Sequence, residues 1–388
     1  MKKINLILAI ILLAVMAGCG GGKQSTDALI IVDVTKNYPK KELILQDFMD
    51  VEYIPLETSD EFITQGVVQD IGKDIILVKN RFSDGDIFVF DRNGKGLKKL
   101  NRLGQGGEEY SGTFRVVLDA NNSEIFVNNY ASNKVLVYNL DGCFIRSFKY
   151  REYSMFATMI NFDSDNLFCY DGSSIDTNIN SFLIISKQDG SITKEIQIPF
   201  KKKISTRMRL RDEANNMSYI LGPANHYPII PYFDDWILVE PSADTLYRYS
   251  PGHNMTPFII RTPSVQSMDP EVFLFMSNLT ERYFFMESVK KVGEFKTMQG
   301  FPTTDLMYDK QEKSIFEYTV RNNDYTDKRF VSMKSGPVSD EICAWQLIEA
   351  YQLVEDYEKG LLKGRLKEIA AKLDEEDNPV IMLVKHKK

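Results

Sequence analysis

Three segments of the chain repeat the same kind of turn at a constant interval. They span residues 90–94, 138–142 and 186–190, and their final glycines lie 48 residues apart in both steps. Each turn follows a short run rich in β-branched and aromatic residues and leads into a further expected strand. A period of about 50 residues that is built from short strands and a turn glycine is typical of a β-propeller. The repeat predicts the architecture but not the chemistry, because propellers serve as enzymes, binders and scaffolds alike.

The repeat divides the chain into blades of short antiparallel strands. We expect blade one at residues 66–100, blade two at 114–148, blade three at 156–198, blade four at 227–261 and blade five at 283–333. Within blade one, strands are expected at residues 67–71, 75–79, 86–91 and 96–100. An insertion rich in lysine and arginine at residues 201–216 interrupts the register before blade four. A short helix is expected at residues 269–279, before blade five.

The two ends of the chain supply the remaining strands. Residues 51–56 and 380–384 each form an apolar β-rich run. Propellers commonly close by joining both termini in one blade, which removes open sheet edges. Pro55 cannot donate a ladder hydrogen bond, so we place its strand at an edge. The prediction is an all-β, six-bladed propeller whose termini close blade six.

One long segment near the C-terminus has a helical pattern. Over residues 339–373, Ser339 is a candidate helix cap, and Ile342, Trp345 and Ile348 fall near one helical face. Glycines at positions 360 and 364 are expected to divide the segment into two helices. It either packs over the propeller, or it docks a partner.

The N-terminus has the pattern of an export signal. Lys2 and Lys3 precede an apolar stretch that is shorter than the roughly 20 residues of a membrane-spanning helix, and small residues lead to Cys19. We predict lipidation of Cys19; the alternative is an ordinary cleaved signal peptide. The domains are then a lipoprotein signal peptide at 1–19, a tether and N-terminal extension at 20–50, and the propeller at 51–388, with the helical segment at 339–373 inside the last blade.

Composition and cysteine spacing exclude several kinds of partner. The remaining cysteines, at positions 143, 169 and 343, form no CxxC or Cys/His cluster, so we expect buried free thiols and no zinc site. The net charge is −7, with both signs mixed along the chain, so no nucleic-acid partner is expected. No cofactor is expected either. Residues 104–106 (Gly-Gln-Gly) lack the third glycine and the following helix of a dinucleotide motif.

Three segments also carry a family resemblance. Residues 51–58 (VEYIPLET), 87–95 (IFVFDRNGK) and 102–110 (RLGQGGEEY) are similar to the six-bladed β-propeller lipoproteins of Bacteroidetes, whose blade turns look like those of NHL repeats. The resemblance spans nearly the whole mature chain. It implies this fold and an envelope location but no established activity, so it supplies no catalytic residues. Gly107 departs from the family, in which proline is frequent at this position.

The loops at one end of the ring are the candidate ligand face. The crossover between blades one and two and the loops between second and third strands should share this end. The candidate residues are Arg81, Arg102, Gln105, Glu108, Tyr110 and Tyr130, with Asn80, Asn133, Asp171 and Asp176 beside them. Arginine, tyrosine and carboxylates around a shallow funnel suit a glycan or a peptide. The alternative is a solvated loop rim that binds nothing.

No catalytic constellation can be recognised from spacing. The three histidines are isolated, and His226, the one that could face the axis, is expected to be structural. Some propeller enzymes hold an axial metal with residues from the starts of the innermost strands. Those starts are expected at Val67, Phe114, Phe156 and Tyr283, which are apolar or aromatic. No catalytic or metal-binding residue is therefore predicted.

The function predicted from the sequence is a non-catalytic binding or scaffold module. It would be lipid-anchored to the outer membrane of the cell envelope and recognise a glycan, a peptide or an envelope protein. Because no acidic residue directly follows Cys19, we expect it to face the periplasm. The alternative is a propeller enzyme, a hydrolase or lyase, with an axial metal site. Three or more carboxylates or histidines clustered at the channel would favour that alternative.

Overall fold

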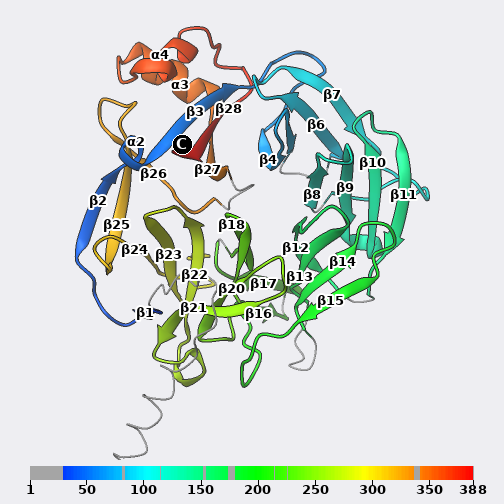
Figure 1. The fold of residues 1–388 in the computed structure, drawn as a ribbon. Helices are drawn as coiled ribbons and strands as arrows, with labels where there is room; N and C mark the ends of the chain where they lie inside the picture. The colour runs from blue at the N-terminus through cyan, green and yellow to red at the C-terminus, as the bar shows by residue number, and fades with distance from the viewer. Residues whose placement is uncertain are drawn as a thin grey trace, which may run out of the picture.

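The computed structural model describes residues 29–80, 84–113, 115–151, 154–173, 180–213, 215–224, 226–335 and 341–387. Six sheets stand around a common axis, each with its first strand innermost (Figure 1). The prediction of an all-β, six-bladed propeller is confirmed. Arg81, Phe114, Asp176 and Ser339, which carried parts of the sequence interpretation, lie outside the described residues.

Blades one to three are regular four-stranded antiparallel sheets. Blade one contains β4 (Val67–Ile71), β5 (Ile75–Lys79), β6 (Asp86–Asp91) and β7 (Gly96–Asn101). Blade two contains β8 (Arg115–Asp119), β9 (Glu124–Asn129), β10 (Lys134–Asn139) and β11 (Phe144–Lys149), with the 3₁₀ turn η2 (Tyr130–Ser132) between β9 and β10. Blade three contains β12 (Phe156–Asn161), β13 (Asn166–Asp171), β14 (Phe182–Ser186) and β15 (Ile192–Ile196). The strand bounds predicted for blade one agree with these to within one residue.

The glycines of the 48-residue repeat lie in the turns between third and fourth strands. Gly94, Gly142 and Gly190 have φ values of 85°, 80° and 72°, which favour glycine. Each also packs on the outer strand of the preceding blade. A Cβ atom on Gly94 would lie 2.0 Å from the carbonyl oxygen of Pro55, and one on Gly190 would lie 2.4 Å from the Phe148 ring. The repeat therefore marks the contact between successive blades as well as the turn.

In blades four and five, a fifth strand is hydrogen-bonded to the outer edge of the four-stranded sheet. Blade four contains β18 (Ile229–Tyr232), β19 (Asp235–Leu238), β20 (Thr245–Tyr249) and β21 (Met255–Thr262), and η3 (Val265–Ser267) follows it. Blade five contains β22 (Val272–Leu279), β23 (Tyr283–Lys290), β24 (Thr303–Asp309) and β25 (Ser314–Asn322), with the short β26 (Arg329–Val331) paired to β25. The N-terminal extension supplies the fifth strands: β1 (Ile30–Asp33) pairs in parallel with β21, and β2 (Lys40–Ile44) pairs in parallel with β25.

The expected helix at residues 269–279 was wrong, because β22 forms the innermost strand of blade five. Seven of its eight residues are buried, so it has no alternation of polar and apolar side chains to mark it as a strand. Tyr283 consequently begins the second strand of the blade rather than the first. The strands of the propeller also begin at Ile30, well before the expected boundary at residue 51.

Blade six joins the two ends of the chain, as predicted. Its order is β27 (Ile342–Ile348), β28 (Val380–His386) and β3 (Met49–Pro55), and Ile381 pairs with Ile54 across β28 and β3. Pro55 lies on the edge strand, as expected. The short helix α2 (Leu45–Phe48) connects β2 to β3.

The predicted division into two helices is confirmed, but their start was misplaced. Residues 342–348 are a strand, and α3 (Ala350–Glu358) and α4 (Gly364–Ala370) follow it. Leu353 and Leu366 are fully buried in one core cluster with Tyr53 and Val331. The helices therefore pack against the outer side of blades five and six (Figure 1). No helix in the described ranges is long and apolar enough to cross a membrane.

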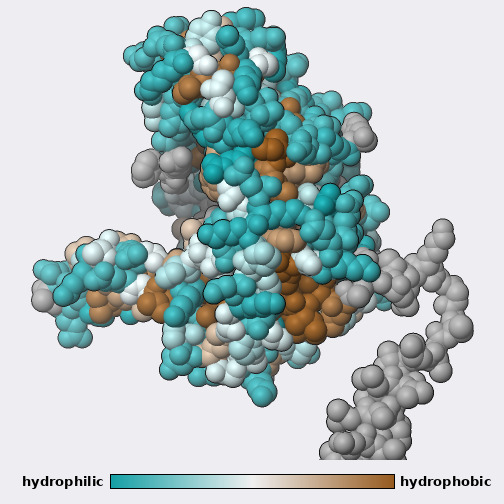
Figure 2. Space-filling view, turned by 90° about the vertical axis from the view of Figure 1, so that its left-hand side faces the viewer, coloured by the Kyte–Doolittle hydropathy of each residue, from teal (hydrophilic) through white to brown (hydrophobic). Residues whose placement is uncertain are grey.

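The charged insertion forms a hairpin of its own. Strands β16 (Met208–Asp212) and β17 (Met217–Leu221) pair only with each other. Its base is fixed, because Lys203 forms an ion pair of 2.8 Å with the buried Glu240. The outer part is largely exposed and corresponds to the arm that stands out from the body in Figure 2.

Candidate functional site

A cavity of about 700 Å³ lies on the propeller axis, within the range of ordinary small-ligand sites. Its walls come from the inner strands β4, β8, β12 and β18, and Trp345 of β27 completes them. The lining extends to the turns between first and second strands, including Gly72, Ser164 and Asp234. It also includes Lys187, in a turn between third and fourth strands. The cavity therefore reaches the end of the ring where these turns lie.

The wall of the cavity is mixed in character. Its polar members include Gln69, Asp70, Arg115, Thr158 and Asn161, and its aromatic members include Tyr227, Phe233, Trp236 and Trp345. The register shifts in β4 between Val68 and Asp70, and in β12 between Phe156 and Thr158. Such irregularities change the direction of the side chains that follow. They explain how polar residues reach the axis although both strands begin with apolar residues.

Asp70 joins the inner strands of blades one and two. Its Oδ2 accepts a hydrogen bond of 2.8 Å from the backbone N–H of Leu118, and its Oδ1 accepts one of 2.8 Å from the N–H of Ile71. Burial raises the pKa of Asp70 to about 6, although these hydrogen bonds and the nearby Arg115 favour the ionised form. Both carboxylate oxygens are therefore held by the backbone.

Arg115, the first residue of β8, also lines the cavity. Its guanidinium makes no hydrogen bond or ion pair to any residue that the structure describes. Burial lowers its pKa, while the electrostatic influence of Tyr227 and Asp70 acts in the opposite direction. Arg115 is therefore a cation in the cavity whose hydrogen-bond donors are uncommitted within the described chain.

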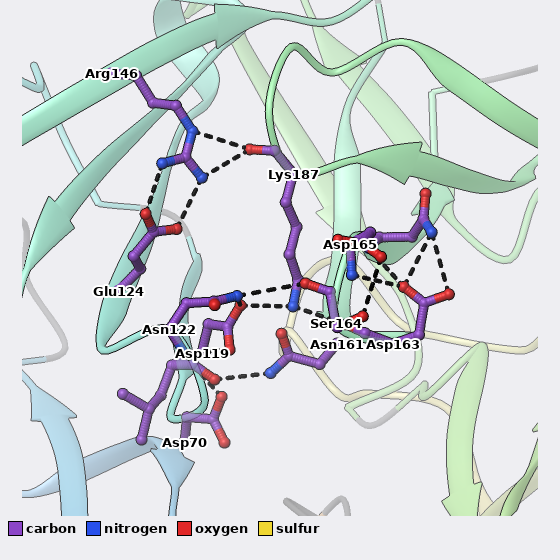
Figure 3. A network of polar contacts seen from close by, with 12 residues as sticks. Asp70, Asp119, Asn122, Glu124, Arg146, Asn161, Asp163, Ser164, Asp165 and Lys187 are labelled. Carbon is purple, nitrogen blue, oxygen red and sulfur yellow. Dashed lines mark hydrogen bonds and ion pairs between the residues drawn. The ribbon is translucent and has the colours of Figure 1, made fainter.

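A buried ion pair fixes the wall between blades two and three (Figure 3). The Nζ atom of Lys187 lies 2.7 Å from Oδ2 of Asp119, and both side chains are 3% exposed. Lys187 also donates to the carbonyl of Asp163, and Asn161 donates to the carbonyl of Leu118 at 2.7 Å. A buried pair between two segments favours one arrangement of them, and here it holds the cavity wall in place.

Comparison with known proteins supplies a family. The sequence matches the domain of unknown function DUF4934 over residues 29–385. The chain belongs to the DUF4934 family. No curated protein matches it.

Solved structures resemble this DUF4934 chain in fold. A Bacteroides fragilis protein that is described as exported is 16% identical and has a TM-score of 0.61, and the match covers 93% of this chain and 100% of that one. A DUF4221 family member from Bacteroides vulgatus is 10% identical with a TM-score of 0.46, and the match covers 88% and 98% of the two chains. The first likeness supports the propeller fold.

The candidate ligand face predicted from the sequence lies elsewhere in the DUF4934 propeller. Its described residues come from crossovers and loops at the other ends of the strands, and none of these described residues lines the axial cavity. Tyr110 is 1% exposed; its hydroxyl donates to the carbonyl of Gly85 and accepts from the backbone N–H of Arg102. Arg102 donates through Nε to the carbonyl of Gly142. These two side chains thus have structural contacts.

The other members of that face differ in accessibility. Gln105 and Glu108 are exposed, and Tyr130 is 47% exposed. Asn80 accepts the N–H of Gln65, and the buried Asp171 accepts hydrogen bonds from serines 154 and 173 and pairs with Arg151. Arg81 and Asp176 lie outside the described residues. The structure therefore leaves Gln105, Glu108 and Tyr130 as an accessible set.

The residues of the axial cavity were missed by the sequence analysis. Gln69, Asp70 and Arg115 stand inside or at the start of otherwise apolar inner strands. A polar residue within an inner strand was the available signal, because such strands are expected to be buried on both faces. Trp345 was missed for a second reason: its segment was assigned to a helix.

The described part of the chain contains no group of three or more histidine, cysteine or carboxylate side chains that could hold a metal ion. His226 is not among the cavity residues. It packs between the rings of Phe275 and Tyr170, and burial lowers its pKa to about 4. Cys169 and Cys343 are buried free thiols, whereas Cys143 is exposed, contrary to expectation.

Proposed function

We propose that this DUF4934 propeller is a non-catalytic binding module that holds a small glycan in its axial cavity. The observation that carries the proposal is the mixed wall of the cavity of about 700 Å³. Aromatic side chains offer flat apolar faces for the C–H surface of a sugar ring. The amide oxygens of Gln69 and Asn161 offer acceptors for sugar hydroxyls, and the hydroxyl of Thr158 offers both a donor and an acceptor.

The rigidity of the wall supports binding without large rearrangement. Asp70, Asn161 and Lys187 each connect one blade to the next through a hydrogen bond or ion pair. A preformed site avoids the entropic cost of ordering its side chains when the ligand arrives. The exposed Tyr130 favours a second contact, with a partner protein, at the opposite end of the ring.

The proposal includes an anchor in the cell envelope. The apolar N-terminal stretch and Cys19 support export and lipidation, and the neutral to basic residues after Cys19 support an outer-membrane protein that faces the periplasm. Membrane fractionation of wild type and Cys19→Ala tests the anchor. A variant that remains with the membranes would contradict it. Cleavage by protease added to intact cells would contradict the periplasmic orientation.

Substitution of two glutamines tests where the ligand binds: one glutamine lies in the axial cavity and the other on the crossover face. Isothermal titration of residues 23–388 against envelope oligosaccharides, with inorganic divalent metals as a separate arm, identifies a ligand. Gln69→Ala should weaken glycan binding about tenfold, since one buried hydrogen bond to the ligand is lost. Gln105→Ala, on the opposite face, should leave affinity unchanged. The reverse result would place the ligand on the crossover face, and binding of a metal alone would favour the enzyme alternative.

A further inference from the structure

Among the described residues, the guanidinium of Arg115 has no hydrogen-bond or ion-pair partner, and this bears on the charge of the ligand. Other partly buried arginines of neighbouring blades have partners: Arg146 binds Glu124 at 2.6 Å, and Arg151 lies 3.0 Å from Asp171. Arg115 has no such partner among the described residues. Withdrawing a guanidinium from bulk water without an opposing charge is costly, and arginine stays protonated in proteins. A bound anion would offset that cost.

Asp70 is not an ion-pair partner of Arg115. Arg115 and Asp70 influence each other electrostatically, but no nitrogen of Arg115 lies within 4 Å of the carboxylate. Both oxygens of Asp70 already accept backbone N–H groups, from Ile71 and Leu118. Turning the carboxylate toward Arg115 would leave those N–H groups unpaired, which carries its own cost.

A second cation lies close to Arg115. Lys79 of β5 donates through Nζ to the carbonyl of Thr113, and that carbonyl is its only hydrogen-bond partner in the described chain. Burial lowers the pKa of Lys79, and the proximity of Arg115 lowers it further. This end of the inner strands therefore carries two neighbouring positive groups, and the electrostatic potential there favours a negative group.

Resting on the proposed function, we propose that the ligand is an acidic saccharide whose carboxylate binds the guanidinium of Arg115. The planar fork of arginine matches a carboxylate through two parallel hydrogen bonds. The nearby Asp70 disfavours a doubly charged phosphate more than a singly charged carboxylate. The remainder of the sugar then lies against the aromatic and amide wall of the cavity.

The test compares sugars that differ only in charge. The mature chain is titrated with oligogalacturonides and oligoglucuronides, with the methyl esters of the same oligomers, and with a sugar phosphate. The acids should bind at least tenfold more tightly than their esters, since a charge-assisted hydrogen-bond pair is lost in the ester. Esters that bind as well as the acids, or a phosphate that binds more tightly than either, would overturn the inference while leaving the proposed function standing. No binding by any sugar would count against both.

Variants of Arg115 test whether this residue recognises the ligand or only stabilises the fold. Arg115→Gln keeps a planar polar group but removes the charge, so the preference for acid over ester should fall about tenfold, with ester affinity little changed. Arg102→Gln, at an exposed arginine that does not line the cavity, is the control and should keep the preference. The melting temperature of ligand-free Arg115→Gln should not fall, because no described ion pair is broken. A marked loss of stability together with an unchanged preference would show that Arg115 is structural.

Discussion

At the residue scale, the turn glycines of the repeat are required both by their backbone conformation and by their contact with the preceding blade. Gly94 adopts a positive φ of 85° and also lies against the carbonyl of Pro55 in the preceding blade. A turn alone would tolerate asparagine or aspartate at a left-handed position. At Gly94, asparagine and aspartate are excluded as well, because the Cβ of any other residue would overlap the carbonyl oxygen of Pro55.

Replacing Gly94 by alanine should lower the free energy of unfolding by about 2–4 kcal/mol, from backbone strain and from displacement of the Pro55 carbonyl. Urea denaturation measures the change. Gly107→Ala is the control, since a Cβ there would meet nothing within 4 Å, and its effect should stay below about 0.5 kcal/mol. Equal effects at the two positions would refute the inter-blade explanation.

At the element scale, the N-terminal extension is part of the ring because its strands are fixed at specific points. The side chain of Asp309 in β24 is fully buried and lies 2.8 Å from Nζ of Lys41 in β2 and 2.9 Å from Arg282. Burial opposes ionisation, but the hydrogen bonds from Arg282 and Lys41 outweigh it and hold the pKa of Asp309 well below its usual range.

A carboxylate whose pKa is lowered by folding stabilises the protein above its unfolded pKa, near 4, and loses that contribution as the pH falls. Asp309→Asn should therefore cost about 1–3 kcal/mol at pH 7 and about 1 kcal/mol less at pH 3, where the unfolded carboxyl is largely protonated but the folded one is still ionised. Denaturation curves at both pH values measure this difference. Asp60→Asn, at an exposed position, should show no such dependence. A cost that is the same at both pH values would mean that packing, not charge, is lost.

At the scale of the whole molecule, the ring is held closed by one strand. β28 lies between β27 and β3, so it joins a strand from late in the chain to one from its beginning. Ile381 is fully buried there. It lies in one cluster with Ile54 of β3 and with Phe88, which belongs to blade one. Closure therefore also stabilises the neighbouring blade.

Ile381→Ala should lower the free energy of unfolding by about 2–5 kcal/mol, the usual cost of a cavity in a core. The two tryptophans, Trp236 in blade four and Trp345 in blade six, should still report the same midpoint in single-tryptophan variants. Ile192→Ala, at a position 40% exposed on an outer strand, should change little. Loss of the Trp345 signal at lower urea than the Trp236 signal would show that blade six opens independently.

The blade repeat, the strands of blade one and the composite sixth blade were predictable from sequence. Their signals are local: alternating apolar residues, a turn glycine and a proline at an edge. The helix expected at 269–279 and the helical assignment of residues 342–348, within the segment expected at 339–373, failed for the same local reason. Both segments are inner strands made mostly of consecutive apolar residues, and such a run has no periodicity that distinguishes strand from helix.

For the candidate site, the sequence predicted the chemical type of the binding residues but not which residues form the site. Loop residues such as Tyr110 and Arg102 have the chemistry of a binding face, but the fold uses them for contacts within and between blades. The cavity residues come from five different blades, and two of their strands carry register shifts that no local pattern reveals.

By itself, the sequence determined the number and spacing of the blades, since a turn glycine and its flanking strands act over a few residues. Only the tertiary structure decided which side chains meet on the axis, and it placed β1 and β2 in parallel on blades four and five. Those contacts join residues up to hundreds of positions apart. They depend on the shape and charge of surfaces that exist only once the ring has closed.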